Sequence, residues 1–231
     1  MTAIGCFETR HQRDELLPTH RHGSAYAALV LDGSHLEASV DGIFDCEPGT
    51  LILHPRFHAH GNRFGNLGAR VVNIALPDDL AADSLRALRV HHLGDASELV
   101  ERNPQALSSL IAAAQLLPSS PLPDWQPILL EQLRTTDAPI GDLCRHLGVS
   151  AAHASRALLR SHGMSPQLLR RELRWRRALA LLHGNDSLAD VAMQSGFADQ
   201  SHLTRIARLH TGLPPAALRR QIKSVQDPAE S

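Results

Sequence analysis

The sequence predicts an α+β protein: a small N-terminal β-barrel, then a helical linker, then an all-α C-terminal domain. Three observations predict this order. Residues 16–77 show short apolar runs between turn residues, residues 83–135 space their apolar positions as a helix does, and residues 140–219 contain one helical pattern twice. We therefore divide the chain into residues 1–80, 81–123 and 124–225.

The N-terminal strands are expected between strong turn signals. Asp41-Gly42 is typical of a hairpin, Pro48-Gly49 marks another turn, and Asp32-Gly33 is interpreted as a third. The expected strands are Ala25–Leu31, His35–Val40, Ile43–Cys46, Thr50–His54 and Val71–Leu76. Strands this short and this evenly interrupted favour a small sandwich or barrel.

The segment 81–123 is expected to be mainly helical. A helix beginning at Asn103-Pro104 would carry apolar residues at Leu107, Leu110, Ile111, Ala114 and Leu117. The proline-rich residues 118–123 then read as a linker, and Asp124 is expected to cap the helix that starts at Trp125.

A helical unit appears twice in the C-terminal part. In residues 187–219, Ser187 precedes a short helix, Gly196 marks a turn, and a second helix follows and stops at Gly212. We expect that second helix to bury Leu203, Ile206 and Leu209. An earlier copy, residues 140–170, aligns with an offset of 48 residues before the turn and 49 after it. Two short helices around a glycine turn indicate a helix-turn-helix, here at residues 140–162 and 187–211.

Charge is divided between the two parts of the chain. Residues 1–139 carry 10 Arg and 17 Asp or Glu, a net charge of −7, whereas residues 140–223 carry 13 Lys or Arg and 5 Asp or Glu, a net charge of +8. A basic domain attracts polyanions, so the charge predicts double-stranded DNA as a partner of the C-terminal part.

The repeated unit resembles the AraC/XylS family of transcription regulators. The resemblance is carried by Gly196-Phe197, Ser201, Arg205, Gly212, Pro215, Arg174, Ala178 and Leu181-Leu182. Ala207 and Leu218 depart from it, since the family usually has phenylalanine and tyrosine there. The resemblance implies a sequence-specific regulator, with RNA polymerase as a further partner. It also implies a dimerisation helix near Leu107–Leu117; packing of that helix against the barrel is the alternative, and both stay open.

The same resemblance implies which side chains face DNA. Bases would be contacted by Ala152, Ser155 and Arg156 in the first unit, and by Gln200, Ser201 and Arg205 in the second, while Arg160 and Arg208 would meet phosphates and Thr204 also points outward. Arg can bond guanine O6 and N7 together, and Gln can do the same with adenine N6 and N7. The second unit is therefore expected to dominate specificity.

The N-terminal part resembles the cupin, or jelly-roll, sensor domain. The resemblance is carried by His20-x-His22, Val30-Leu31-x-Gly33, Pro48-Gly49, His54-Pro55 and His60-x-x-Arg63-Phe64. In cupins that bind metal, these motifs supply three histidines and a glutamate. Here the place of the glutamate is held by Tyr26 or its neighbours, so an ordinary cupin metal site is incomplete.

The histidines of this part admit three interpretations. Residues two apart on a strand face the same way, so His20 and His22 can converge, and His60 takes the place of the second motif's histidine. We expect an effector pocket of His20, His22, Tyr26 and His60. A divalent metal (Zn or Ni) on His20, His22 and His60 is the second interpretation, and a purely structural role is the third.

Other functional classes have less support. No run approaches eighteen apolar residues and no secretion signal is present, so we expect a cytoplasmic protein that does not enter a membrane. The sequence shows no nucleophile, phosphate-loop or paired-carboxylate motif, and we expect no enzyme. The alternatives that remain are a cupin metal-dependent enzyme fused to a DNA-binding domain and a thiol sensor using Cys6 or Cys46. Cys144 is expected to lie in a helical core.

Overall fold

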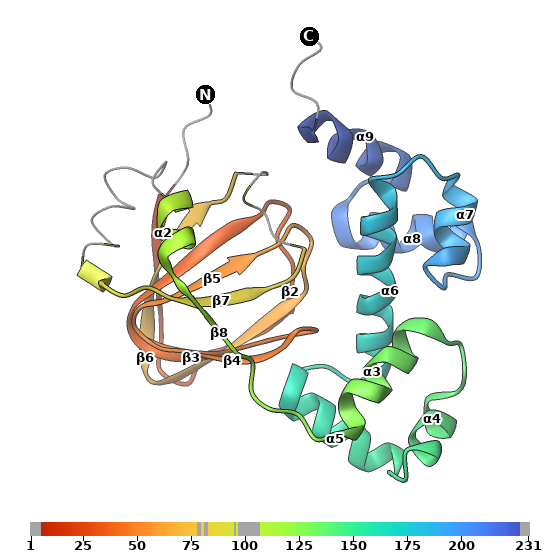
Figure 1. Ribbon diagram of the computed structural model, residues 1–231, viewed down its shortest axis with the longest axis horizontal. Coiled ribbons are helices and arrows are strands. Elements are labelled where there is room, and N and C mark those ends of the chain that lie inside the picture. Colours follow the sequence, from red (N-terminus) through yellow and green to blue (C-terminus); the bar gives the residue numbers. More distant parts are fainter. Residues whose placement is uncertain (1–5, 78–79, 81–82, 95, 97–106, 227–231) are drawn as a thin grey trace. The chain divides into compact units, whose positions relative to one another are not determined.

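The computed structural model describes residues 6–77, 80, 83–94, 96 and 107–226. The chain divides into two compact units, which apart from residues 161–163 meet between Pro121 and Leu122. Among the described residues, the first is an antiparallel sheet that includes the short helix α2, and the second is helical (Figure 1). The predicted order, an N-terminal β domain and then an all-α domain, is confirmed. The start of the expected helix at Asn103-Pro104 lies outside the described residues.

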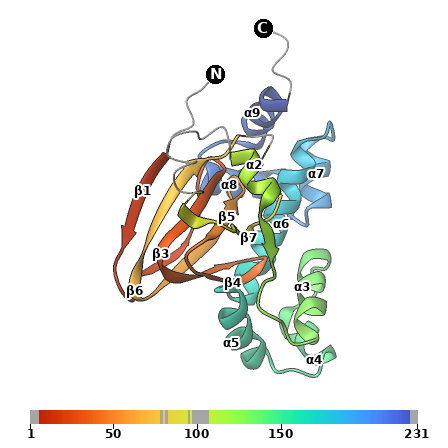
Figure 2. The same ribbon diagram turned by 60° about the vertical axis from the view of Figure 1, so that its left-hand side comes forward.

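Eight strands form the sheet of the first unit. They are β1 (Cys6–His11), β2 (Leu16–His20), β3 (Tyr26–Ser39), β4 (Gly42–Cys46), β5 (Thr50–His54), β6 (His60–Ala75), β7 (Arg86–Arg89) and β8 (Gln115–Leu117). The main strand order is β1-β6-β3-β5-β7-β8, while β2 pairs with β6 and β4 pairs with β3. Figure 2 shows the sheet strongly curled. The predicted barrel is an open one, because no described pairing joins β1 to β8.

The long strands β3 and β6 form the centre of this unit. They pair from Tyr26↔Ala75 to Ser39↔His60, and each has different outer neighbours in its two halves. The first half of β3 lies beside β5 and its second half beside β4. The two long strands thus run through both halves of the sheet, with β5 and β1 beside one half and β4 and β2 beside the other.

The expected turn at Asp32-Gly33 is wrong. These residues lie within β3, where the register with β6 shifts on either side of them. Gly33 has φ +71°, and a Cβ placed on it would lie 2.0 Å from the carbonyl oxygen of Gly68, itself at φ +70°. Two glycines that face each other at positive φ make a bulge here, which bends the strand without ending it. The turns at Asp41-Gly42 and Pro48-Gly49 are confirmed by the β3–β4 hairpin and by the hydrogen bond from Thr50 N to Glu47 O, 2.9 Å.

The described residues of segment 81–123 are partly helical and partly strand. Leu93, Gly94 and Ala96 are helical, and α2 (Leu107–Ala113) is a further helix, whereas β7 and β8 pair with each other and extend the sheet beyond β5. Leu107 is buried in the apolar cluster that lies on one face of β3, β5 and β6. The apolar residues at helical spacing over 107–117 thus belong to one short helix and one strand. The strand has only three residues, too few to show the two-residue alternation typical of strands.

The helical C-terminal part of the chain contains seven helices among the described residues. They are α3 (Trp125–Thr135), α4 (Ile140–His146), α5 (Ala151–His162), α6 (Pro166–Leu182), α7 (Leu188–Gln194), α8 (Gln200–Thr211) and α9 (Pro215–Gln226). Helices α4 and α7 begin 48 residues apart, and α5 and α8 begin 49 apart, which confirms the sequence repeat. The core includes Trp175, Leu158, Leu169, Leu182 and Leu203, all fully buried.

Two details of the expected packing are wrong. Leu209 is 71% exposed, so α8 buries Leu203 and Ala207 instead. Asp124 lies in the helical region of backbone angles and accepts no capping hydrogen bond. Cys144 is fully buried, as expected, and the two residues that depart from the AraC pattern, Ala207 and Leu218, are fully buried too.

Candidate functional site

The two outer helices of the repeated units, α5 and α8, have the same construction. Each has 12 residues. The side chain of Ser150 accepts a hydrogen bond from His153 N (3.1 Å) at the start of α5, and that of Asp199 accepts one from His202 N (2.7 Å) at the start of α8. After each helix comes a glycine at positive φ, Gly163 or Gly212. Both helices therefore have fixed starts and ends.

The nine candidate DNA-contacting residues all lie on α5 and α8. Seven are exposed, and Ser155 and Thr204 are half-buried. The Thr204 hydroxyl donates a hydrogen bond to the carbonyl oxygen of Gln200 (2.8 Å), so its proton is engaged within the helix. None of the four arginines, Arg156, Arg160, Arg205 and Arg208, pairs with another described side chain. Their guanidinium groups are free to meet an external anion, and their contact with DNA stays a prediction.

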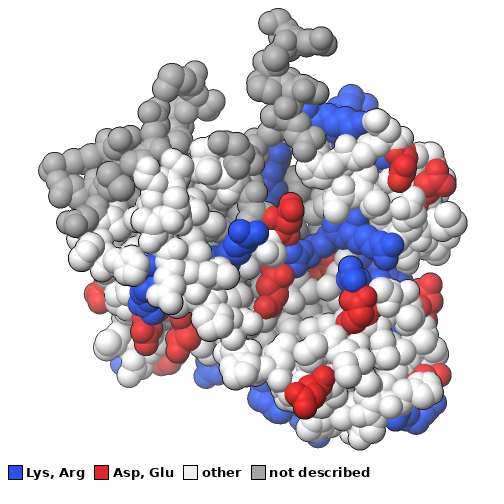
Figure 3. Space-filling model, viewed as in Figure 1, with Lys and Arg blue, Asp and Glu red and all other residues white. Residues whose placement is uncertain are grey.

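Helix α6 connects the two helix-turn-helix units and contacts both of them. Its 17 residues span about 26 Å at 1.5 Å per residue. The Arg170 guanidinium donates to the carbonyl oxygen of Ala138 (2.7 Å), and that of Arg174 donates to the carbonyl oxygen of Thr136 (3.3 Å) and pairs with Asp137. The chain just before α4 is therefore tied to α6. In Figure 3, Lys and Arg side chains form a band across the visible face of the helical unit.

The C-terminal unit matches a known domain family. Residues 143–221 match the model of a helix-turn-helix domain, and the match includes both repeated units. The chain carries an AraC-type helix-turn-helix domain. This confirms the repeat as two helix-turn-helix units of one domain.

Solved structures with a similar fold include ToxT from Vibrio cholerae. It is 14% identical, with 95% of this chain and 98% of that chain covered and a TM-score of 0.44. A second ToxT structure, bound to an unsaturated fatty acid, is 13% identical at 95% and 95% coverage with a TM-score of 0.43. The C-terminal domain of AraT, a response regulator from Geobacillus stearothermophilus, is 20% identical at 44% and 88% coverage with a TM-score of 0.41. These scores are too low to transfer a function to this chain.

Neither the curated proteins nor the hydropathy of the helices indicates a function. A search of the curated proteins finds no match to this chain. Among the described residues, no helix combines the length and the hydropathy that a membrane span requires.

The second candidate site is the group of histidines in the N-terminal unit. The structure brings His20, His22 and His60 together, with one ring nitrogen of each within 4.8 Å of the others. Tyr26 is adjacent, because its hydroxyl lies 3.2 Å from Nε2 of His60 and its ring stacks on His54 at 4.2 Å. The four residues expected to share a site are therefore neighbours, and their role stays a prediction.

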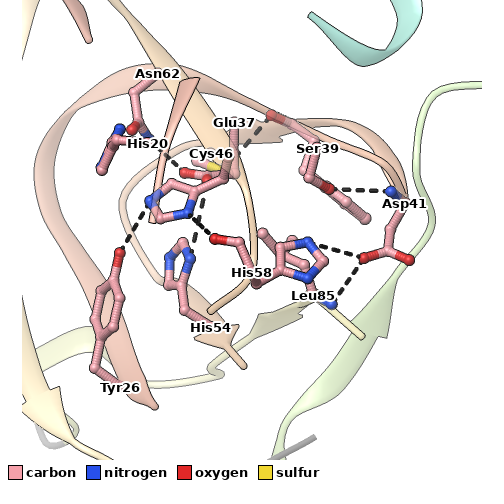
Figure 4. A network of polar contacts seen from close by, with 12 residues as sticks. His20, Tyr26, Glu37, Ser39, Asp41, Cys46, His54, His58, Asn62 and Leu85 are labelled. Atoms are coloured by element: carbon pink, nitrogen blue, oxygen red, sulfur yellow. Dashed lines mark hydrogen bonds and ion pairs between the residues drawn. The ribbon is translucent and has the colours of Figure 1, made fainter. Parts of the chain in front are cut away.

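Sequence reasoning missed Glu37, which is 1% exposed. Its carboxylate Oε2 lies 3.4 Å from Nε2 of His35 and accepts a hydrogen bond from the Asn62 amide. Glu37, His54 and His60 form a second group whose potential ligand atoms lie within 4.8 Å of one another. Figure 4 shows Tyr26, His54, His58 and Glu37 pointing into the same interior region. The one available signal was the spacing of His35, Glu37 and Ser39, three polar residues on one face of a strand.

Burial keeps these groups in their neutral forms. Burial and neighbouring imidazoles hold the pKa of His54 well below its usual value, and burial lowers the pKa of His60 to about 4 although Glu37 opposes the shift. Burial and Glu37 raise the pKa of Tyr26, so its hydroxyl keeps its proton. Because Nδ1 of His60 lies 3.3 Å from the carbonyl oxygen of His58, the proton belongs there and the lone pair is on Nε2, to which Tyr26 donates.

The cysteines offer little support for a thiol sensor. Cys46 is fully buried, and burial together with the nearby Glu37 raises the pKa of its thiol well above the usual range. A thiol held in its protonated form is a poor nucleophile. Cys6 lies exposed at the start of β1.

Proposed function

We propose that the protein is a sequence-specific DNA-binding transcription regulator whose N-terminal unit binds a small effector. The observation that carries the proposal is the AraC-type helix-turn-helix domain at residues 143–221, with two capped outer helices and four arginines that pair with no side chain in the described part of the protein. Such helices fit the major groove, where base edges present distinguishable donors and acceptors. The net charge of +8 on residues 140–223 favours the same polyanion.

The N-terminal unit would hold a ligand rather than turn it over. Its support is the group of His20, His22, Tyr26 and His60, which combines neutral imidazoles and a phenol at the edge of a largely apolar fold. His22 is exposed, so a ligand could reach this group from solvent. RNA polymerase and a second copy of the chain follow as partners from the AraC resemblance alone and stay predictions.

The test is selection of binding sites from random duplexes by the full chain. We expect one enriched sequence, bound at least 10³-fold more tightly than random DNA. The affinity should fall with salt at a log–log slope of about −4 to −5, as expected for neutralising four to six phosphates. A folded chain that enriches no sequence and shows no salt-dependent binding to duplex DNA would contradict the proposal.

A further inference from the structure

Two side-chain atoms in the core of the N-terminal unit face each other, and neither has a hydrogen-bond partner among the described residues. They are Oε1 of Glu37 and Nδ1 of His54, which are 3.9 Å apart, and both side chains are at least 97% buried. This separation is too long for a hydrogen bond. Leaving a polar atom unpartnered in a core costs about 1–3 kcal/mol, and more for a charged one, so a group that contacts both atoms would be strongly favoured here.

A cation that bridges these two atoms would satisfy both. Zinc binds imidazole nitrogen at about 2.0–2.1 Å and carboxylate oxygen at about 2.0–2.2 Å, so two ligand atoms of a tetrahedral ion lie about 3.4 Å apart. The observed 3.9 Å between Glu37 Oε1 and His54 Nδ1 exceeds this by a distance that side-chain rotation can close. A water molecule alone would serve less well, since the carboxylate also needs a compensating charge.

His60 supplies the third ligand residue, and one of its ring nitrogens already has a hydrogen-bond partner. Its Nδ1 lies against the carbonyl oxygen of His58, an arrangement that fixes the tautomer of many metal-binding histidines. Nε2 is left with the lone pair, and the hydroxyl of Tyr26 that now donates to it can move aside or share the ion. His60, His54 and Glu37 each present one ligand atom, all within 4.8 Å of one another.

The chemistry of this donor set defines the class of ion. Two imidazoles and one carboxylate suit zinc, ferrous iron, nickel and similar transition metals, whereas calcium and magnesium prefer oxygen ligands only. The single negative charge of Glu37 compensates part of the charge of a divalent ion. The three-histidine group of His20, His22 and His60 provides no such charge, and it shares His60, so both groups cannot be occupied through that residue.

We propose that Glu37, His54 and His60 form a binding site for one divalent transition-metal ion, with at least one coordination position open to water or an effector. The carboxylate that the cupin resemblance lacks beside the first two histidines is thus provided from the second half of β3. The inference does not rest on DNA binding, which the C-terminal unit performs with other residues.

The test uses the full chain without a histidine tag, stripped of metal with a chelator and then titrated with zinc chloride. We expect one zinc per chain by elemental analysis and calorimetry, with a rise in the thermal unfolding temperature. Glu37→Gln and His54→Ala should each weaken zinc binding by about 100-fold or more, since loss of even an outer partner costs 10–100-fold. Glu47→Gln is the matched control, because Glu47 is an exposed acid that pairs with Arg89.

The double variant His20→Ala/His22→Ala distinguishes the two histidine groups. It should still bind one zinc if the site is Glu37, His54 and His60. Loss of zinc in this double variant, with binding kept in Glu37→Gln, would place the ion on the three-histidine group and overturn the proposal. A wild-type chain that binds no zinc, iron or nickel would overturn it as well.

X-ray absorption of the zinc-loaded wild-type chain provides a result that does not depend on the folding of any variant. Two imidazoles with oxygen ligands are expected. A first shell of three imidazoles would contradict the assignment of Glu37 as a ligand.

Discussion

The two helix-turn-helix units repeat the same pattern but are built into the domain differently. In the first unit, the turn glycine Gly148 has φ +70° and open space around it: a Cβ there would meet nothing within 4 Å. In the second, Gly196 has φ +78°, and a Cβ would lie 3.0 Å from Nε of Arg174 on α6. The first turn therefore needs glycine for its backbone angle alone, and the second needs it also for close packing against the linking helix.

Arg174 contacts both helix-turn-helix units and so links them. Its guanidinium meets the turn of the second unit and also the chain just before the first unit, through Thr136 and Asp137. The Arg174 side chain is 16% exposed, but Asp137 is 82% exposed, so their ion pair is expected to contribute no more than a surface pair. One side chain thus positions parts of both units relative to α6.

The outer helices differ at the residues that would face bases. Helix α8 begins with the exposed polar residues Gln200 and Ser201, whereas α5 begins with Ala151 and Ala152. Alanine offers a base only apolar contact, while glutamine and arginine can bond two atoms of one base. The difference predicts that, on DNA, the second helix-turn-helix unit selects sequence and the first mainly adds affinity.

The largest expected effect concerns the stability lost when each turn glycine is replaced by alanine. Gly196→Ala should lower the free energy of unfolding of the helical unit by about 2–4 kcal/mol, because strain at positive φ costs roughly 1–2 kcal/mol and Arg174 must also move. Gly148→Ala should cost only the backbone strain, about 1–2 kcal/mol. Urea unfolding followed by tryptophan fluorescence measures this in the full chain, since both tryptophans, Trp125 and Trp175, belong to the helical unit.

A double-mutant cycle gives the control for this comparison. In an Arg174→Ala background, the extra cost of Gly196→Ala over Gly148→Ala should disappear. Equal losses for the two glycines in the wild-type background would show that the contact with Arg174 does not constrain the turn.

The C-terminal half of the structure could be predicted from the sequence because its information is local and repeated. Helix caps, turn glycines and helical spacing each involve residues within one or two turns of each other, and the repeat provided the pair α4 and α5 a second time as α7 and α8. The errors there concern tertiary packing. Leu209 has the spacing of a core residue but lies on a face of α8 that no other element covers enough to bury it.

The N-terminal site was only half predictable. The spacing of His20 and His22 is visible in the sequence, and so is the place of His60. Glu37 and His54 enter the same group only because β3, β5 and β6 pair in a particular register, with Glu37 opposite Asn62 and Tyr26 opposite His54. That register passes through the bulge at Asp32-Gly33, and the sequence alone suggested a turn there. A shift of one residue would turn Glu37 to the other face of the sheet.

The second prediction compares the base-facing arginines. Arg205→Ala should cost about 1–3 kcal/mol, roughly 5–150-fold in affinity, on the preferred sequence, and should relax the preference at one base pair. Arg156→Ala should cost less and should leave the selected sequence unchanged, because α5 begins with Ala151 and Ala152, which cannot hydrogen-bond to bases, where α8 begins with Gln200 and Ser201. Site selection with each variant measures this. Identical sequence preferences for wild type and Arg205→Ala would refute the assigned roles.

The smallest expected effect concerns the two arginines further along the outer helices, Arg160 on α5 and Arg208 on α8. Each is exposed and pairs with no described acid, so each can meet a phosphate. A phosphate contact carries no sequence information, so either substitution by alanine should weaken binding to preferred and random duplexes by a similar factor. Each should also reduce the salt slope by about 0.9, since one fewer counterion is released.

Titrations of both duplexes at several salt concentrations measure these two quantities together. The prediction gives Arg160→Ala and Arg208→Ala the same effect on affinity and on salt slope, although their helix-turn-helix units are expected to differ in reading bases. It therefore tests whether the difference between the units is confined to base contacts. If Arg208→Ala changed the selected sequence while Arg160→Ala did not, the second unit would read bases along more of α8 than its first two turns. If both left the salt slope unchanged, neither arginine would contact a phosphate, and the charge of the domain would act only at long range.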